Sequence, residues 1–122
     1  MSQNASNELA DHLGRIALTY PGVETGPSCN NMAYKAAGKA FVFVGIRPDR
    51  CEVRLKLGAS YEEAEQLAAE APKVWEPGKF GWVKVTLPDG EGAPDGLLER
   101  WMEESYRLLA KKALVRELDA RS

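Results

Sequence analysis

The chain has 122 residues, of which 44% are hydrophobic and 28% are charged, and its formal net charge at pH 7 is −2. This length fits one globular domain with a single core, so we expect one domain over residues 1–122 with an ordered core at about 7–112. The slight net acidity argues against a protein that coats nucleic acid non-specifically, and no apolar run approaches the roughly 20 residues that span a bilayer.

The amino-terminal residues and the cysteines indicate the compartment. The first residues of the chain lack the basic and apolar regions of a signal peptide, so we expect a cytoplasmic protein. Cys29 and Cys51 form no CxxC pair and are expected to be free thiols, with Cys51 buried and Cys29 exposed. A single histidine argues against a structural zinc site, and the glycines form neither GxGxxG nor a P-loop, so we expect no metal and no nucleotide cofactor.

The first predicted element is an amphipathic helix over residues 7–20. Its apolar residues recur at helical spacing, at Leu9, Leu13, Ile16, Ala17 and Tyr20. Pro21 and Gly22 end the helix, and Gly14 weakens it by about 1 kcal/mol relative to alanine.

Residues 38–57 predict a β-hairpin, the element around which the rest of the chain is organised. The first arm, residues 39–46, is apolar and rich in β-branched and aromatic side chains. The second arm alternates between two sets, with Cys51, Val53, Leu55 and Leu57 on one side and Glu52, Arg54 and Lys56 on the other. Pro48 and Asp49 supply the turn between the arms. Residues 32–36 are expected to form a short strand that precedes the hairpin.

A second helix and two further strands follow the hairpin. Ser60 and Glu63 have the spacing of a capping box, which predicts a helix over residues 61–71. Residues 73–75 are a candidate for a short strand. Residues 80–87 predict a half-buried strand, because they alternate between Val83, Val85 and Leu87 on one side and Trp82, Lys84 and Thr86 on the other.

The last predicted element is a long helix that begins after Asp95, its expected N-cap. Its stripe continues almost to the carboxyl end of the chain, through Leu98, Trp101, Met102, Ser105, Leu108, Leu109, Leu114 and Leu118. The order helix, strands, helix, strands, helix predicts an α+β fold, a mostly antiparallel sheet covered by the N-terminal, middle and C-terminal helices. We expect the core to bury together Phe41, Val53, Leu55, Val83, Val85, Leu98, Trp101 and Leu108.

Two residues could in principle carry catalysis. His12 is the only side chain whose ordinary pKa lies near neutrality, but no acid or nucleophile motif accompanies it, so a surface or boundary position is the simpler interpretation. Cys29 follows Ser28, but a catalytic cysteine needs a positioned base and a lowered pKa, and the sequence shows neither. We therefore expect a protein that is not an enzyme.

Charge is segregated along the chain. Residues 33–57 contain six basic and two acidic residues, and residues 89–104 contain six acidic residues and one arginine. The basic set consists of Lys35, Lys39, Arg47, Arg50, Arg54 and Lys56, with Lys84 on a neighbouring strand and Tyr34, Trp75 and Trp82 as candidate aromatic surface. Basic strands with aromatic residues can bind nucleic acid by neutralising phosphates and stacking on bases. From the charge pattern alone, a solvated sheet face balanced by acidic helices is the simpler interpretation.

Five short motifs occur in an order that resembles the MmcQ/YjbR-like family. They lie between about Leu9 and Lys112, and they are Tyr20-Pro21-Gly22-Val23-Glu24, Gly38-Lys39-Ala40-Phe41, Leu55-Lys56-Leu57, Gly81-Trp82-Val83-Lys84-Val85 and Ser105-Tyr106-Arg107-Leu108. The resemblance implies a compact α+β domain similar to a double-wing DNA-binding fold, and it supplies no catalytic residues. The positions that match the family's recurring pattern are Lys39, Lys56, Trp82, Ser105 and Tyr106.

With this resemblance added, we expect a non-enzymatic module that binds nucleic acid, DNA first, through a basic sheet face. The predicted site residues are Lys39, Arg47, Arg50, Arg54, Lys56, Trp82 and Lys84. The alternative is a protein-interaction or small-molecule-binding module with no nucleic-acid role, and an enzyme is the third possibility. We expect no metal, no cofactor and no membrane association, and we favour a monomer.

Overall fold

The computed structural model describes residues 2–89 and 91–121, and for residues 2–6 it describes the backbone only. Among these residues, six strands form one antiparallel sheet in the order β1-β2-β3-β4-β6-β5. The strands are β1 (Val23–Ser28), β2 (Asn31–Ala36), β3 (Lys39–Arg47), β4 (Arg50–Lys56), β5 (Trp75–Pro77) and β6 (Trp82–Pro88). The helical segments are α1 (Ser2–Thr19), α2 (Tyr61–Glu70), the 3-10 turn η1 (Lys79–Gly81), α3 (Leu97–Leu109) and α4 (Lys112–Ala120). The predicted α+β class with an antiparallel sheet is confirmed.

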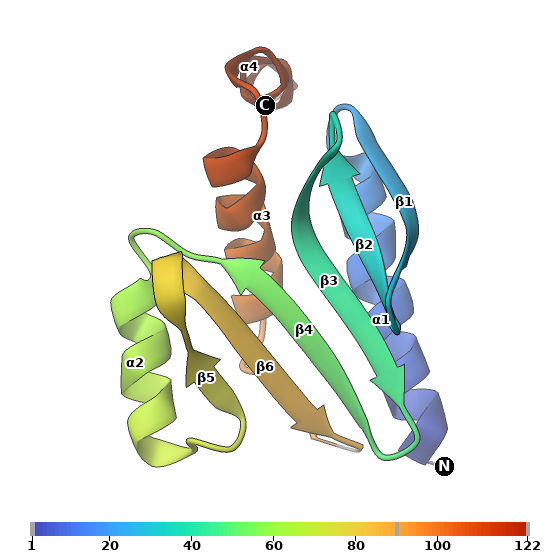
Figure 1. The fold of residues 1–122 in the computed structure, drawn as a ribbon, viewed down its shortest axis with the longest axis vertical. Coiled ribbons are helices and arrows are strands. Elements are labelled where there is room, and N and C mark those ends of the chain that lie inside the picture. Colours follow the sequence, from blue (N-terminus) through green and yellow to red (C-terminus); the bar gives the residue numbers. More distant parts are fainter. Residues whose placement is uncertain (1, 90, 122) are drawn as a thin grey trace.

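The helices are distributed unequally around the sheet. Figure 1 shows α1 and α3 behind the strands, and both pack against β3 and β4. Helix α2 lies beside β5, at one edge of the sheet. None of the described helices covers the other face of the central strands β3, β4 and β6. This face is therefore open to solvent.

The core lies between the sheet and the helices α1 and α3. Val53 and Leu55 of β4 lie opposite Val85 and Val83 of β6, and all four side chains are buried. On α3, the Trp101 ring meets the buried Trp75 ring edge-on, with 5.6 Å between the centroids. The other predicted core residues are also buried, namely Phe41, Leu98 and Trp101.

Leu108 is the exception among the predicted core residues, because its side chain is 48% exposed. It lies in the last turn of α3 and packs against Gly58, in the loop that follows β4, rather than against the sheet. The expectation that Leu108 is buried is therefore wrong.

A β-bulge in β3 turns two consecutive residues toward the core. The pairing with β2 skips Phe41, which is the extra residue, so Phe41 joins Val42 on the buried side. The carbonyl of Phe41 accepts a hydrogen bond from Ser105 Oγ at 2.6 Å. The same hydroxyl oxygen accepts the backbone N–H of Lys56 at 2.9 Å. Ser105 thus bridges β3 and β4 at the point where their direct pairing ends.

One predicted helix start is confirmed without its capping box, and another is wrong. Ser60 is the N-cap residue of α2, as expected, but it makes no capping hydrogen bond, and its N–H and hydroxyl both donate to the carboxylate of Glu104 on α3. Glu63, its expected partner, accepts a hydrogen bond from Trp101 Nε1 at 3.0 Å. Helix α3 begins after Gly96, whose φ of 76° is left-handed, and not after Asp95. Ser60 and Glu63 both make hydrogen bonds with side chains of α3, and the local spacing of the sequence does not reveal such tertiary contacts.

The predicted C-terminal helix is in fact two helices. Ala110 and Lys111 have extended backbone angles and separate α3 from α4. The break turns α4 across the end of the molecule, as Figure 1 shows, where Leu114 lies over Gly22. An uninterrupted helix would carry Leu114 away from the core, so tertiary packing decides where the helix ends.

Candidate nucleic-acid interface

The open face of the sheet carries those side chains of β4 and β6 that alternate with the buried ones. Arg54 of β4 lies between its register partners, Phe43 of β3 and Lys84 of β6. Further along β4, Lys56 lies opposite Trp82. Because directly opposite residues of antiparallel strands point to the same side, these five side chains share the face that is turned away from α1 and α3.

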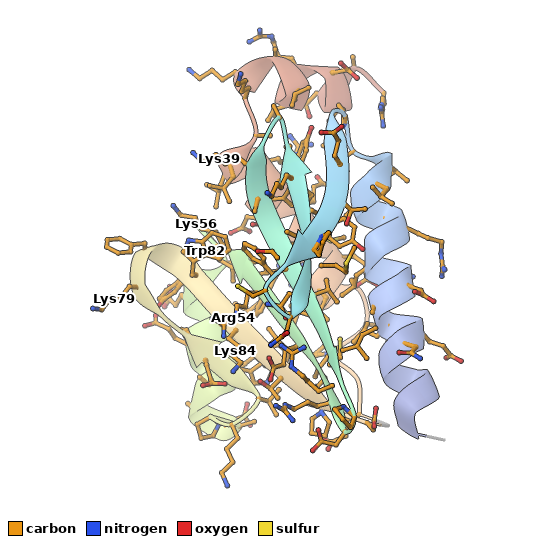
Figure 2. All side chains as sticks on the ribbon, turned by 45° about the vertical axis from the view of Figure 1, so that its right-hand side comes forward. Lys39, Arg54, Lys56, Lys79, Trp82 and Lys84 are labelled. Atoms are coloured by element: carbon orange, nitrogen blue, oxygen red, sulfur yellow. The ribbon has the colours of Figure 1, made fainter. Side chains whose placement is uncertain are left out.

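Four of these side chains line a groove of about 370 Å³, namely Phe43, Arg54, Trp82 and Lys84. The rings of Phe43 and Trp82 lie 6.1 Å apart at an interplanar angle of 49°. Lys79 of η1 and Glu76 of β5 also line the groove. Figure 2 shows the cationic side chains and Trp82 on the side of the sheet opposite α1. We call the following set the aromatic–basic patch: Phe43, Arg54, Lys56, Lys79, Trp82 and Lys84.

The cations of the aromatic–basic patch are mostly unpaired. Among the described residues, no ion pair engages three of the four cations, namely Arg54, Lys56 and Lys79. The fourth, Lys84, has its Nζ 4.0 Å from a carboxylate oxygen of Glu52. The acidic residue of the groove, Glu76, is exposed and lies opposite Lys84. The patch is therefore locally positive, although the whole chain has a net charge of −2.

Arg47 and Arg50, two of the predicted site residues, are ion-paired with Glu52. Arg50 Nε lies 2.9 Å and Arg47 Nη2 lies 3.3 Å from the carboxylate oxygens of Glu52. Burial alone would raise the pKa of Glu52, but the hydrogen bond from Arg50 and the charges of Lys84 and Arg47 hold this pKa below its ordinary value. The Glu52 carboxylate therefore stays ionised and offsets part of the positive charge at this end of the hairpin.

Arg47 also has a structural role. Its guanidinium donates hydrogen bonds to the Asn30 carbonyl at 3.0 Å and to Asn31 Oδ1 at 2.9 Å. The guanidinium lies so close over Gly45 that a Cβ atom there would be 2.7 Å from Arg47 Nη1. Arg47 thus ties the turn between β1 and β2 to the hairpin of β3 and β4, and both of its terminal nitrogens are already engaged.

Lys39 and two of the candidate aromatic residues lie elsewhere. Lys39 is the first residue of β3 and lies opposite the buried Ala36, beyond the bulge that shifts the alternation of side chains along the strand. Figure 2 shows Lys39 at the far end of the sheet from Lys84. Tyr34 and Trp75, expected as surface aromatics, are buried in the core. Of the predicted site residues, the structure brings together four, namely Arg54, Lys56, Trp82 and Lys84.

Sequence reasoning missed two residues of the η1 turn, Lys79 and Phe80. Lys79 lines the groove, and the Phe80 side chain is 82% exposed. Phe80 has a φ of 60°, in the left-handed region that bulky residues rarely adopt. The signal that could have found them is the pair Gly78 and Gly81, because two flanking glycines indicate a tight turn that presents the residues between them.

The remaining candidate residues are His12 and the two cysteines. His12 is exposed on α1, as expected, and its Nε2 lies 2.7 Å from Glu99 Oε2 on α3. Cys29 is exposed and Cys51 is buried, and both are free thiols, as expected. Burial raises the pKa of Cys51 to about 11. Within the described residues, no cluster of side chains suited to a metal ion occurs and no helix is long and apolar enough to cross a membrane.

Comparison with known proteins agrees with this architecture. Among solved structures, the crystal structure of Deinococcus radiodurans protein DR2400, which has a DUF419 domain, matches with a TM-score of 0.68 and 26% sequence identity, over 90% of this chain and 87% of that one. No curated protein matches the sequence. The fold is therefore one that known small α+β domains share. A model of the YjbR family matches residues 18–108, and the chain belongs to the YjbR family.

Proposed function

We propose that this protein binds nucleic acid, with DNA as the first ligand, through the aromatic–basic patch and without catalysing a reaction. The observation that carries the proposal is that unpaired cations and two neighbouring aromatic rings share one open face of the sheet. Net positive charge attracts the phosphate backbone, and aromatic planes accept bases, so the two features together fit a nucleic acid.

Each side chain of the patch has a distinct role in this proposal. Arg54 and Lys84 are neighbours across the strands and neutralise adjacent phosphates. Lys56 and Lys79 extend the positive surface around Trp82, as Figure 2 shows. The Trp82 ring supplies the apolar plane of the groove. A nucleic acid lying across the patch would therefore meet positive charge for its phosphates and a stacking surface for its bases.

The salt dependence of binding tests this proposal. For duplex DNA, the logarithm of the binding constant falls linearly with the logarithm of the salt concentration, with a slope of about −0.9 for each phosphate neutralised. The Arg54→Ala/Lys56→Ala double variant should reduce the magnitude of this slope by about two. Its folding should be nearly unchanged, because exposed charges contribute little to stability. Titration of labelled oligonucleotides at several salt concentrations measures the slope.

A second double variant controls for net charge. Arg15→Ala/Lys112→Ala removes two exposed positive charges, one on α1 and one on α4, and should keep the wild-type slope. Equal losses in both double variants would mean that binding follows net charge and not the patch. If no oligonucleotide binds even at low salt, where electrostatic attraction is strongest, the proposed function is wrong.

A second candidate function rests on a different groove. Met32 and Ile46 are 41% and 43% exposed, and they line a groove of about 420 Å³ beside α1. Large apolar side chains exposed together are typical of surfaces that bind proteins. A protein-interaction module with no nucleic-acid role is therefore the alternative, and it gains support if every oligonucleotide fails to bind.

A further inference from the structure

We propose that the ligand of the aromatic–basic patch is single-stranded DNA, and that the Phe80 ring stacks on one of its bases. This inference rests on the proposed function, because it concerns the form of the nucleic acid bound at the same patch. It starts from an aromatic side chain that the fold exposes to solvent and does not use in the core.

The η1 turn is anchored at both of its ends. The Gly78 N–H donates to the Trp82 carbonyl at 2.7 Å, and the Leu57 N–H donates to the Gly81 carbonyl at 2.8 Å. The Tyr61 hydroxyl donates to the Gly78 carbonyl at 2.6 Å. These bonds tie the turn to β6, to the end of β4 and to α2, so the backbone is held in place before any ligand binds.

Phe80 is held in this turn with a strained backbone. Its φ of 60° and ψ of 25° lie in the left-handed region, where a side chain is unfavourable and glycine is relaxed. Its side chain is 82% exposed, so it contributes almost nothing to the core. Strained residues that packing does not explain occur preferentially at binding sites. Phe80 serves neither the turn nor the core, so we assign its ring to a ligand.

The surroundings of Phe80 favour a single strand over a duplex. Phe80 does not itself line the groove, but it lies in the chain between Lys79 and Trp82, which both do. In a duplex the bases stack on one another, so an approaching duplex would use only the cations of the patch. An unpaired strand exposes its base faces, which stack on aromatic side chains. The rings of Phe43, Trp82 and Phe80 therefore match the chemistry of a single strand.

The acidic residue of the groove is consistent with the same ligand. Glu76 lies opposite Lys84 and lines the groove together with the Trp82 ring. A phosphate placed there would be repelled by the carboxylate. The exocyclic amino group of a base can instead donate a hydrogen bond to a carboxylate. A strand whose bases enter the groove and whose phosphates follow the cations satisfies both kinds of side chain.

The Phe80→Gly variant tests whether the Phe80 ring binds a ligand or has only a structural role. It removes the ring and supplies the residue that the left-handed backbone prefers, so the denaturation midpoint should not fall. We expect its affinity for a single-stranded oligonucleotide to fall by about 5- to 150-fold, the loss of one stacked base. Its affinity for a duplex of the same sequence should change by less than about two-fold, because the cations remain.

Two further variants complete the test. Phe80→Tyr keeps an aromatic plane and should retain the wild-type affinity for the single strand. Leu18→Ala removes an apolar side chain of α1 that is 49% exposed, and should change neither binding nor its strand preference. The same sequence as RNA should bind within about ten-fold of the DNA strand, because stacking and charge are common to both. A larger preference for RNA would overturn the assignment to DNA.

The outcomes distinguish this inference from the proposed function. Wild-type affinity of Phe80→Gly for the single strand would overturn the inference alone. Tighter binding of the duplex than of the single strand by the wild-type protein would do the same, and the patch would remain a nucleic-acid site. If neither form binds at low salt, the proposed function is overturned and the inference with it.

Discussion

The hydroxyl of Ser105 lies where β3 and β4 separate, and it replaces one hydrogen bond between the strands. It satisfies two backbone groups that lie just beyond the last paired residues of the two strands, the carbonyl of Phe41 and the N–H of Lys56. Ser105 is fully buried, so water does not reach these groups if the hydroxyl is absent. Because the side chain of Lys56 belongs to the aromatic–basic patch, this buried contact also fixes one residue of the surface.

The Ser105→Ala variant should be clearly destabilised. It leaves a buried donor and a buried acceptor without partners, and the loss in free energy of unfolding should be about 1–3 kcal/mol. Urea denaturation of the variant and the wild type measures the difference. Ser28→Ala on β1, where the hydroxyl is only partly buried, is the control and should change the free energy by less than about 0.5 kcal/mol. An unchanged midpoint in Ser105→Ala would show that the bridge contributes nothing.

At the scale of residues, sequence reasoning found the part of the candidate site that depends on local alternation. The alternation of β4 placed Arg54 and Lys56 on one face because side chains in a strand have a period of two. It could not show that Arg47 is engaged with Asn31, since that contact joins the end of β3 to the start of β2. It also missed Phe80, because periodicity carries no information on a side chain presented by a turn.

Among the elements, the contact between α1 and β2 depends on Gly14. A Cβ atom at this position would lie 2.4 Å from the hydroxyl oxygen of Tyr34, whose ring is buried beneath the helix. The sequence shows only the cost of a glycine within a helix. The structure shows that the missing side chain lets α1 approach the sheet closely.

We therefore expect Gly14→Ala to destabilise the protein, although alanine is the better helix former by about 1 kcal/mol. Overpacking a filled site costs about 1–3 kcal/mol, which outweighs this gain. Thermal denaturation measures the sign of the change. In a Tyr34→Phe background, which lacks the nearest atom, the same substitution should cost less. A stabilised Gly14→Ala protein would mean that the helix is free to move away from the ring.

The elements also differ in how well their sequences predict them. Strands β3, β4 and β6 were predictable because each alternates or is apolar along its length. Strand β1 was not, because Gly26 and Pro27 interrupt it and no apolar stripe marks it. The break between α3 and α4 was also missed, since Leu114 continues the apolar stripe and only tertiary packing reveals the change of direction.

Across the whole molecule, glutamate side chains connect elements that are distant in the sequence. The connections are Glu104 with Gly58 and Ser60, Glu63 with Arg100 and Trp101, and Glu99 with His12. Burial alone would raise the pKa of Glu104, but hydrogen bonds from Ser60 and Gly58 lower it below its ordinary value. The hydrogen bonds from Arg100 and Trp101 lower the pKa of Glu63. Both carboxylates are thus more acidic in the folded state than in the unfolded state.

This difference predicts that acid destabilises the fold. A carboxyl whose pKa is lower in the folded state stabilises the protein fully above its unfolded pKa, near 4.5, and loses this contribution as the pH falls through the folded value. Glu104→Gln removes one such titration, so its free energy of unfolding should fall less than that of the wild type between about pH 7 and about pH 3. Urea denaturation at both pH values measures this.

Glu65→Gln is the matched control for the pH experiment. Glu65 is an exposed glutamate on α2 that makes no hydrogen bond with another described side chain. Its substitution should leave the pH dependence of the wild type unchanged. If Glu104→Gln also shows the wild-type pH dependence, the contacts of Glu104 with Ser60 and Gly58 do not lower its pKa in the folded state relative to the unfolded state.

The two edge strands of the sheet bear on self-association. Strand β1 contains Pro27, whose nitrogen carries no hydrogen to donate. Strand β5, at the opposite edge, has three residues, ends at Pro77 and lies beside α2, as Figure 1 shows. A second copy added edge to edge would gain few backbone hydrogen bonds at either end. The sheet therefore resists extension into a larger intermolecular sheet, a safeguard against aggregation that leaves its open face available.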